Sequence, residues 1–187
     1  MLTVNLTTTF QRLSLCRIAI TSLLLQSKLP DQINLWVSKE PYLRDKGIGS
    51  SDVIEQFIYS LPESTRQRLS IRWAENTGPY RKLIPMLRVA APEDIIVTAD
   101  DDIFYGENWL KKLVEAYEAT PNMLVAARVR KIKANVFGVN QSYLYWKIIT
   151  KPATVSDDFV VTFGGGVVLN RHMFCEKDIH TISSNSR

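Results

Sequence analysis

Three consecutive aspartates, Asp100, Asp101 and Asp102, directly follow an apolar, strand-forming run at 95–98. Neighbouring carboxylates repel one another by roughly 1 kcal/mol per pair in a water-like dielectric, and by more when they are partly buried. The cluster is therefore costly unless a cation lies on it, and Mg²⁺ and Mn²⁺ are hard ions that prefer carboxylate oxygen. In an extended segment Asp100 and Asp102 project to the same side while Asp101 points away. This spacing predicts a divalent-metal site on Asp100 and Asp102.

An alternative interpretation of the aspartates is a solvated acidic loop. A helix is expected from about Glu107 to Ala119, and negative charge is favourable near a helix start. The preceding strand favours the metal site instead, because ligands of open α/β sheets gather at the carboxyl ends of the strands.

Strand and helix patterns alternate from the amino terminus to the aspartates. Leu2–Thr8 predicts a strand, and further strands are expected at 33–37, 69–73 and 95–98. Helical patterns lie between them, at 13–27, at 52–59 and up to about residue 89. In the first of these helices, four apolar residues recur at helical spacing and predict one buried face: Leu15, Ile18, Ala19 and Leu23. The alternation predicts an α/β fold with a mainly parallel sheet flanked by helices.

The pattern changes from Leu124 onward. Residues 125–131 alternate as in a half-buried strand, an aromatic segment follows at 143–146, and a strand at 160–163 runs into three glycines. We expect a single domain over residues 1–187, with a nucleotide-binding half at about 1–105, an acceptor-side half at about 106–175 and a polar tail at 176–187.

The composition is that of a folded protein, because 45% of its 187 residues are apolar. The 23 basic and 19 acidic residues are interspersed and leave a net charge of +4, without a polybasic run typical of nucleic-acid tails or membrane-surface patches. The sequence contains neither a membrane-spanning apolar stretch nor a signal peptide, and Cys16 and Cys175 lie far apart. We expect a cytoplasmic protein with no nucleic-acid partner and no transmembrane segment; its oligomeric state is open.

Four segments, in this order, resemble family 2 glycosyltransferases of the GT-A fold. They are Thr7–Phe10, the Asn-Thr-Gly-Pro-Tyr-Arg-Lys-Leu-Ile-Pro segment at 76–85, Thr98–Asp102 and Phe163–Gly166. The resemblance covers about residues 3–170. It implies a Rossmann-like GT-A fold, a nucleotide-sugar donor that is usually a UDP-sugar, a divalent metal such as Mn²⁺ or Mg²⁺, and a glycan or other hydroxyl acceptor.

The resemblance also implies roles for individual residues. Asp100 and Asp102 would hold the metal that bridges the donor diphosphate, and Asp101 would lie beside the ribose or donor sugar. The nucleotide-sugar-binding residues it implies are Thr8, Thr9, Phe10, Gly78, Lys82 and Asp101, and the donor and acceptor pocket would be lined by Gly164, Gly165 and Gly166.

These residues also have interpretations without a ligand. Thr8 and Phe10 could be ordinary strand and core residues, and Lys82 could be a solvated cation near a helix start. The three glycines could form a bulge or a sharp bend within a sheet.

An inverting transfer also needs a general base that takes the proton from the acceptor hydroxyl. The family supplies an Asp or Glu downstream of the glycines, and here only Glu176 and Asp178 follow, of which we predict Asp178. The short remainder indicates a transferase truncated at its C-terminus. Two alternatives stay open: a non-catalytic nucleotide-sugar-binding domain and a metal-dependent nucleotidyltransferase. The nucleotidyltransferases usually carry a Gly-rich basic loop after the first strand, whereas residues 7–12 contain no glycine.

Overall fold

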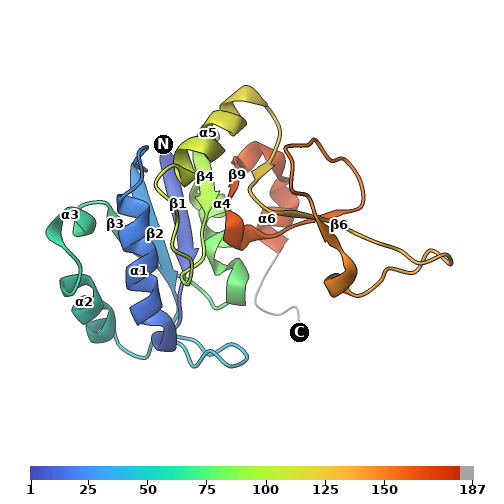
Figure 1. Ribbon diagram of the computed structural model, residues 1–187. Helices are drawn as coiled ribbons and strands as arrows, with labels where there is room; N and C mark the ends of the chain where they lie inside the picture. Colours follow the sequence, from blue (N-terminus) through green and yellow to red (C-terminus); the bar gives the residue numbers. More distant parts are fainter. Residues whose placement is uncertain (182–187) are drawn as a thin grey trace.

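A six-stranded sheet forms the centre of the chain, and a smaller three-stranded sheet projects from it (Figure 1). The computed structural model describes residues 1–181. The strand order of the large sheet is β3-β2-β1-β4-β9-β5, and β9 is antiparallel to both of its neighbours while the remaining pairs are parallel. The predicted α/β fold with a mainly parallel, Rossmann-like sheet is therefore confirmed. Its strands are β1 (Leu2–Thr7), β2 (Gln32–Val37), β3 (Leu69–Trp73), β4 (Ile95–Thr98), β5 (Val125–Ala126) and β9 (Val167–Leu169).

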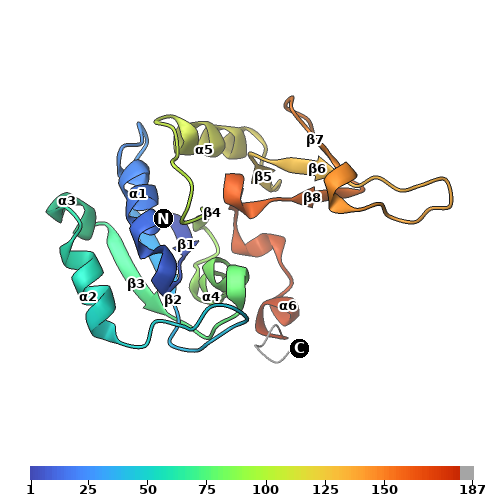
Figure 2. The ribbon, with the colours of Figure 1, turned by 60° about the horizontal axis from the view of Figure 1, so that its bottom comes forward.

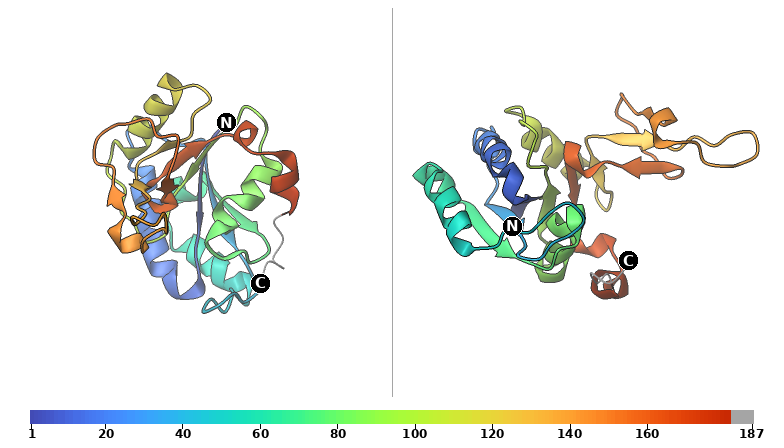
Figure 3. Two further views of the ribbon diagram at one scale, coloured as in Figure 1. Left: turned by 90° about the vertical axis from the view of Figure 1, so that its right-hand side faces the viewer. Right: turned by 90° about the horizontal axis from the view of Figure 1, so that it is seen from below.

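Helices cover both faces of this sheet (Figures 2 and 3). The larger core lies beneath α1 (Leu13–Leu24), α2 (Ser51–Tyr59) and α5 (Trp109–Ala119). The smaller core lies on the opposite face, beneath α4 (Ile84–Val89) and α6 (Glu176–Thr181). The remaining short elements are α3 (Glu63–Arg66) and the 3-10 turns η1 (Phe10–Arg12), η2 (Gly78–Lys82), η3 (Tyr143–Tyr145), η4 (Phe163–Gly165) and η5 (Arg171–Met173).

Strand β1 shows how the two faces differ. Val4 and Leu6 are fully buried in the larger core, and Asn5, between them, points to the other face because side chains alternate along a strand. The Asn5 Oδ1 accepts hydrogen bonds from Asn34 Nδ2 (3.0 Å) and Trp36 Nε1 (3.1 Å) on β2. Buried polar groups need such partners, so these bonds favour one register of β1 against β2.

The buried face of α1 differs from the prediction. Leu15 and Ile18 are exposed, whereas Cys16 and Ile20 are fully buried. The helix is apolar on more than one side, so helical spacing alone fits two stripes that are offset by one residue. The stripe that faces the sheet consists of Cys16, Ala19, Ile20 and Leu23.

The second half of the chain also departs from the predicted strands. The run at 125–131 divides into β5 in the large sheet and β6 (Val129–Lys131) in the small one, because β5 pairs with β9 whereas β6 pairs with other strands. The small sheet has the order β7-β6-β8, with β7 at Lys147–Ile148 and β8 at Phe159–Val161. Residues 176–181, predicted to belong to the polar tail, form α6, and Ile179 is buried in the smaller core.

Gly166, which begins the return into β9, offers a test of this packing. Its φ is +106°, and a Cβ added there would lie 2.5 Å from Trp109 Cζ2 and 2.8 Å from Leu113 Cδ1. We expect Gly166→Ala to lower the free energy of unfolding by about 2 kcal/mol, through backbone strain and overpacking. Gly49→Ala is the matched control, because nothing lies within 4 Å of a Cβ at Gly49. Urea unfolding measures both, and equal midpoints for the two variants would contradict this account.

Candidate functional site

The three aspartates after β4, which we call the acidic tip (Asp100–Asp102), are held by cations and a hydroxyl. Arg12 Nη2 lies 2.7 Å from Asp101 Oδ1 and 2.7 Å from Asp102 Oδ2. Thr8 Oγ1 donates a hydrogen bond of 2.7 Å to Asp101 Oδ2. The Asp101 side chain is buried, whereas those of Asp100 and Asp102 are 37% and 47% exposed. A wholly solvated acidic loop is therefore the wrong interpretation.

Burial has the largest effect on the pKa of Asp101. Burial raises the pKa of Asp101 above its ordinary value, the Thr8 hydroxyl and Arg12 act in the opposite direction, and Asp102 adds to the rise. Burial likewise raises the pKa of the nearby Cys16 thiol, and the negative charge of Asp101 raises it further. The thiol is therefore poorly suited to act as a nucleophile.

Lys82, at the end of η2, lies against Asp100. Its side chain is buried, and Nζ forms an ion pair with Asp100 Oδ1. The interpretation of Lys82 as a solvated cation is thus wrong. Gly78 begins η2 with a φ of +61°, and a Cβ there would lie 2.6 Å from the Tyr42 ring. Glycine therefore allows η2 to pass close to the loop after β2.

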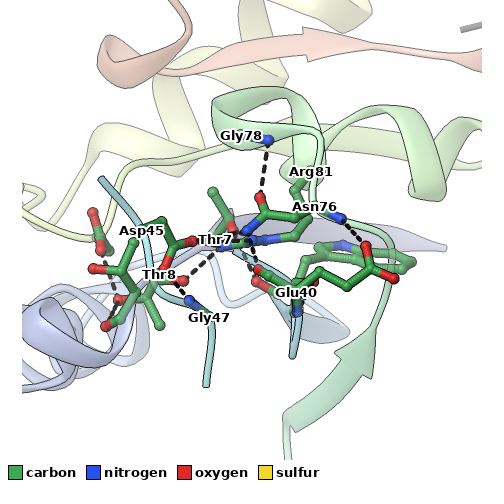
Figure 4. A network of polar contacts seen from close by, with 12 residues as sticks. Thr7, Thr8, Glu40, Asp45, Gly47, Asn76, Gly78 and Arg81 are labelled. Carbon is green, nitrogen blue, oxygen red and sulfur yellow. Dashed lines mark hydrogen bonds and ion pairs between the residues drawn. The ribbon is translucent and has the colours of Figure 1, made fainter. Parts of the chain in front are cut away.

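Arg81, beside Lys82, anchors η2 to the end of β1 (Figure 4). Its Nε donates to Thr7 Oγ1 and its Nη2 to the carbonyl oxygen of Thr8, both at 2.7 Å, and Nη1 lies 3.4 Å from Asp45 Oδ2. Burial lowers the pKa of Arg81, and the Asp45 carboxylate opposes that shift. Proteins tolerate a buried arginine when several oxygen atoms accept its hydrogen bonds. The bond from Arg81 to the Thr8 carbonyl also fixes the position of Thr8.

Asn76 connects the loop after β2 with the start of η2 (Figure 4). Its Nδ2 donates to the carbonyl oxygen of Glu40 (2.7 Å) and to Asp45 Oδ2 (3.1 Å), and its Oδ1 accepts from the Gly78 N–H (3.1 Å). The start of η2 therefore depends on one buried amide side chain, in the manner of an Asx turn.

The glycine stretch closes the other side of the acidic tip. A Cβ added to Gly164 would lie 2.1 Å from Asp100 Oδ2, so only glycine allows this approach. The Tyr105 hydroxyl accepts from the Asp100 N–H (2.7 Å) and donates to the carbonyl oxygen of Gly164 (2.9 Å). Trp109 Nε1 donates to the carbonyl oxygen of Gly165 at 2.7 Å. The glycines are thus a turn fixed against the tip, and Gly166 leads from it into β9.

Three of the residues predicted for the site outside the tip lie next to it. Thr8, Lys82 and Gly164 lie against it, from the ends of β1, η2 and η4. Thr9 precedes η1, and the Phe10 ring is 56% exposed, which rules out a core role for that ring. The backbone of Asp178 lies in α6, but its side chain lies outside the described part of the chain, so its role as a base stays a prediction.

Three residues at this site had no role in the sequence prediction: Arg12, Arg81 and Tyr105. Arg81 lies inside the segment at 76–85, next to Lys82, and Tyr105 follows the aspartates by three residues. Their proximity in sequence is a signal, but arginine and tyrosine at such positions are also common on protein surfaces. Only the fold shows that their polar atoms converge.

The pKa of Asp101 leads to a pH-dependent prediction. Because the pKa is raised in the folded chain, the protonated form favours folding, and this contribution declines as pH rises from about 4 through the folded-state pKa. The difference between the free energies of unfolding, parent protein minus Asp101→Asn, should therefore decrease as pH rises from 4 to 7. Urea titrations at a series of pH values measure it, and a difference that grows with pH would contradict the assigned cause.

Two solved structures illustrate the similarity of fold. The 4-diphosphocytidyl-2C-methyl-D-erythritol synthase from Anaerococcus prevotii superposes with a TM-score of 0.54 at 12% identity, covering 91% of this chain and 70% of that one. The 2-C-methyl-D-erythritol 4-phosphate cytidylyltransferase of Francisella tularensis gives a TM-score of 0.52 at 8% identity, covering 91% and 73%. At such low identity the likeness concerns the fold alone.

Comparison at the level of sequence is more specific. No curated protein matches the chain significantly. A family model described as glycosyl transferase family 2 matches residues 47–174, which include η2, the acidic tip and the glycine stretch. The match spans more than half of the chain and agrees with the predicted GT-A type of sheet. This protein therefore belongs to glycosyl transferase family 2.

Proposed function

We propose that this protein is a glycosyltransferase that moves a sugar from a nucleotide-sugar, most simply a UDP-sugar, to a hydroxyl group of a glycan or other acceptor. The observation that carries the proposal is the convergence of Thr8, Lys82 and Gly164 on the acidic tip, at the carboxyl ends of β1 and β4. Ligands of open α/β sheets bind at such strand ends. The family to which the chain belongs supports the same reaction.

The acidic tip fits a divalent metal by its donor set. Asp100 and Asp102 present half-exposed carboxylates, and Mg²⁺ and Mn²⁺ prefer such oxygens. Among the side chains that the structure describes, no group of three or more His, Cys, Asp or Glu residues is arranged to hold a metal, so the donor diphosphate and water would complete the coordination. When bound, the metal would stabilise negative charge on the leaving nucleoside diphosphate.

The protein's own side chains would bind and orient the donor. Arg12 and Lys82, which pair with the tip in this structure, are the cations within reach of a diphosphate placed there. The exposed Phe10 ring offers a flat face to a uracil base, and Thr9 lies next to it. Asp101 is buried, so we assign it an indirect role in which it positions Thr8 and Arg12.

In the reaction, the bond between the anomeric carbon and the diphosphate oxygen breaks while the acceptor oxygen bonds to that carbon. The acceptor proton passes to a general base, and inversion follows from attack opposite the leaving group. Asp178 is our proposal for this base, on its place after the glycine stretch in the sequence.

A nucleotidyltransferase is the second candidate, because solved structures with a similar fold include a 4-diphosphocytidyl-2C-methyl-D-erythritol synthase and a cytidylyltransferase. Such an enzyme would take a nucleoside triphosphate and release pyrophosphate. Residues 7–12, from the end of β1 through η1, contain no glycine, which argues against close backbone contacts to a triphosphate there. A nucleotide-sugar-binding domain without turnover is the third candidate.

Titration calorimetry with UDP, with and without Mn²⁺, tests the donor site. We expect Mn²⁺ to strengthen UDP binding on the order of tenfold or more, and Asp102→Asn to abolish this gain because it removes a metal ligand. Asp52→Asn, an exposed aspartate at the start of α2, is the matched control and should keep the gain. Equal affinity of the parent protein for UDP with and without Mn²⁺ would contradict the assignment of the acidic tip as a metal-dependent donor site.

Measuring the products released in the same samples distinguishes the three candidate functions. Release of UDP from UDP-sugars, alone or with hydroxyl acceptors, supports the transferase. Release of pyrophosphate from CTP or UTP with sugar or polyol phosphates supports the nucleotidyltransferase. Metal-dependent binding of UDP without either release supports the binding domain.

A further inference from the structure

The three-stranded sheet and its loops, residues 129–161, form an arm that extends from the body of the protein. In Figure 1 and Figure 2 this segment, in orange, reaches furthest from the helices that cover the large sheet. The view from below in Figure 3 shows the same extension. Its strands pair only with one another, so the arm exposes its loops to the surroundings.

Large apolar side chains lie at the end of this arm. Val136 is 93% exposed and Phe137 is 86% exposed. The loop that carries them is ordered by Asn135, whose Oδ1 accepts from the N–H groups of Phe137 (2.9 Å) and Val139 (3.0 Å). A bridge between Ala134 and Asn140 closes the hairpin. An ordered loop that holds several apolar side chains in water is typical of a binding surface.

Further exposed apolar and aromatic side chains lie on a second loop of the arm. Arg130 fixes part of this loop, because its guanidinium lies 4.5 Å from the centre of the Tyr143 ring and donates to the carbonyl oxygen of Trp146 (2.8 Å). The exposed apolar and aromatic residues of the two loops and of the adjoining β7 are Val136, Phe137, Val139, Tyr143, Leu144, Tyr145 and Ile148.

Basic residues outnumber acidic ones in the arm, whose only acidic residues, Asp157 and Asp158, directly precede β8. Residues 119–156 contain six basic residues and no acidic residue, which leaves 17 basic and 19 acidic residues for the rest of the chain. Residues 119–156 therefore carry +6 and the remainder −2, and the arm itself, with its five basic and two acidic residues, carries +3. The exposed basic residues are Arg128, Lys131, Lys133, Lys147 and Lys151. Such separation of charge points to an anionic partner.

We propose that the arm docks on an anionic lipid bilayer. Apolar side chains at the end of the arm would enter the acyl boundary, and the basic side chains would lie on the headgroup phosphates, since peripheral membrane binding combines these two contributions. A purely anionic soluble partner would explain the lysines but not the ordered apolar loop. None of the helices in the described part of the chain has the length and apolar character of a membrane span. The inference does not depend on the proposed reaction.

Co-sedimentation of the full chain with vesicles tests this inference. We expect binding to vesicles of phosphatidylcholine with phosphatidylglycerol, little binding to phosphatidylcholine alone, and weaker binding as salt rises. Val136→Ser with Phe137→Ser, and separately Lys131→Glu with Lys133→Glu, should each lower the partition coefficient on the order of tenfold.

Matched controls are available on the body of the chain. Val89→Ser with Tyr59→Ser replaces exposed apolar residues on α4 and α2, and Lys111→Glu with Lys112→Glu changes two exposed lysines on α5. Both controls should bind vesicles as the parent protein does. Three results would overturn the proposal: no binding to anionic vesicles, equal losses in variants and controls, or concentration-dependent self-association through the arm without vesicle binding. Circular dichroism of each variant distinguishes lost binding from lost folding.

Discussion

Three adjacent carboxylates at the end of one strand must be neutralised, and much of the site follows from that constraint. Each aspartate finds its partner on another element: Asp100 on Lys82 of η2, Asp102 on Arg12 of η1, and Asp101 on Arg12 and on Thr8 after β1. Since like charges this close repel, especially where one is buried, the acidic tip is stable only with these partners in place. The same ion pairs therefore hold together segments that are far apart in the sequence.

A second layer of contacts supports this arrangement. Arg81 binds both Thr7 and Thr8, and Tyr105 joins Asp100 to Gly164. Neither residue needs to touch a ligand to matter, because each fixes the position of a group that would. On the proposed function, a divalent ion and a diphosphate would take over the charges that the side chains now satisfy among themselves. The site is thus suited to exchange partners without leaving a buried charge unpaired.

The large sheet was predictable because its strands carry strong local patterns: β3 and β4 were predicted with the observed ends. The buried face of α1 was not predictable, since the helix is apolar on several sides. The division of residues 125–131 between two sheets depends on partner strands far away in the sequence. In the site, the aspartates and glycines could be recognised from their residue types and spacing. The burial of Arg81 and the hydrogen bonds of Tyr105 to Asp100 and Gly164 arise only from tertiary packing.

Crystals of the protein grown with UDP and Mn²⁺ would show whether the acidic tip binds a metal together with a nucleotide diphosphate. Diffraction data collected at the manganese absorption edge locate the ion without reference to activity. We expect an anomalous peak within bonding distance of carboxylate oxygens of Asp100 and Asp102 and of the diphosphate, with Lys82 no longer paired to Asp100. UDP bound elsewhere, or an unchanged pair of Lys82 and Asp100 without manganese at the tip, would contradict this expectation.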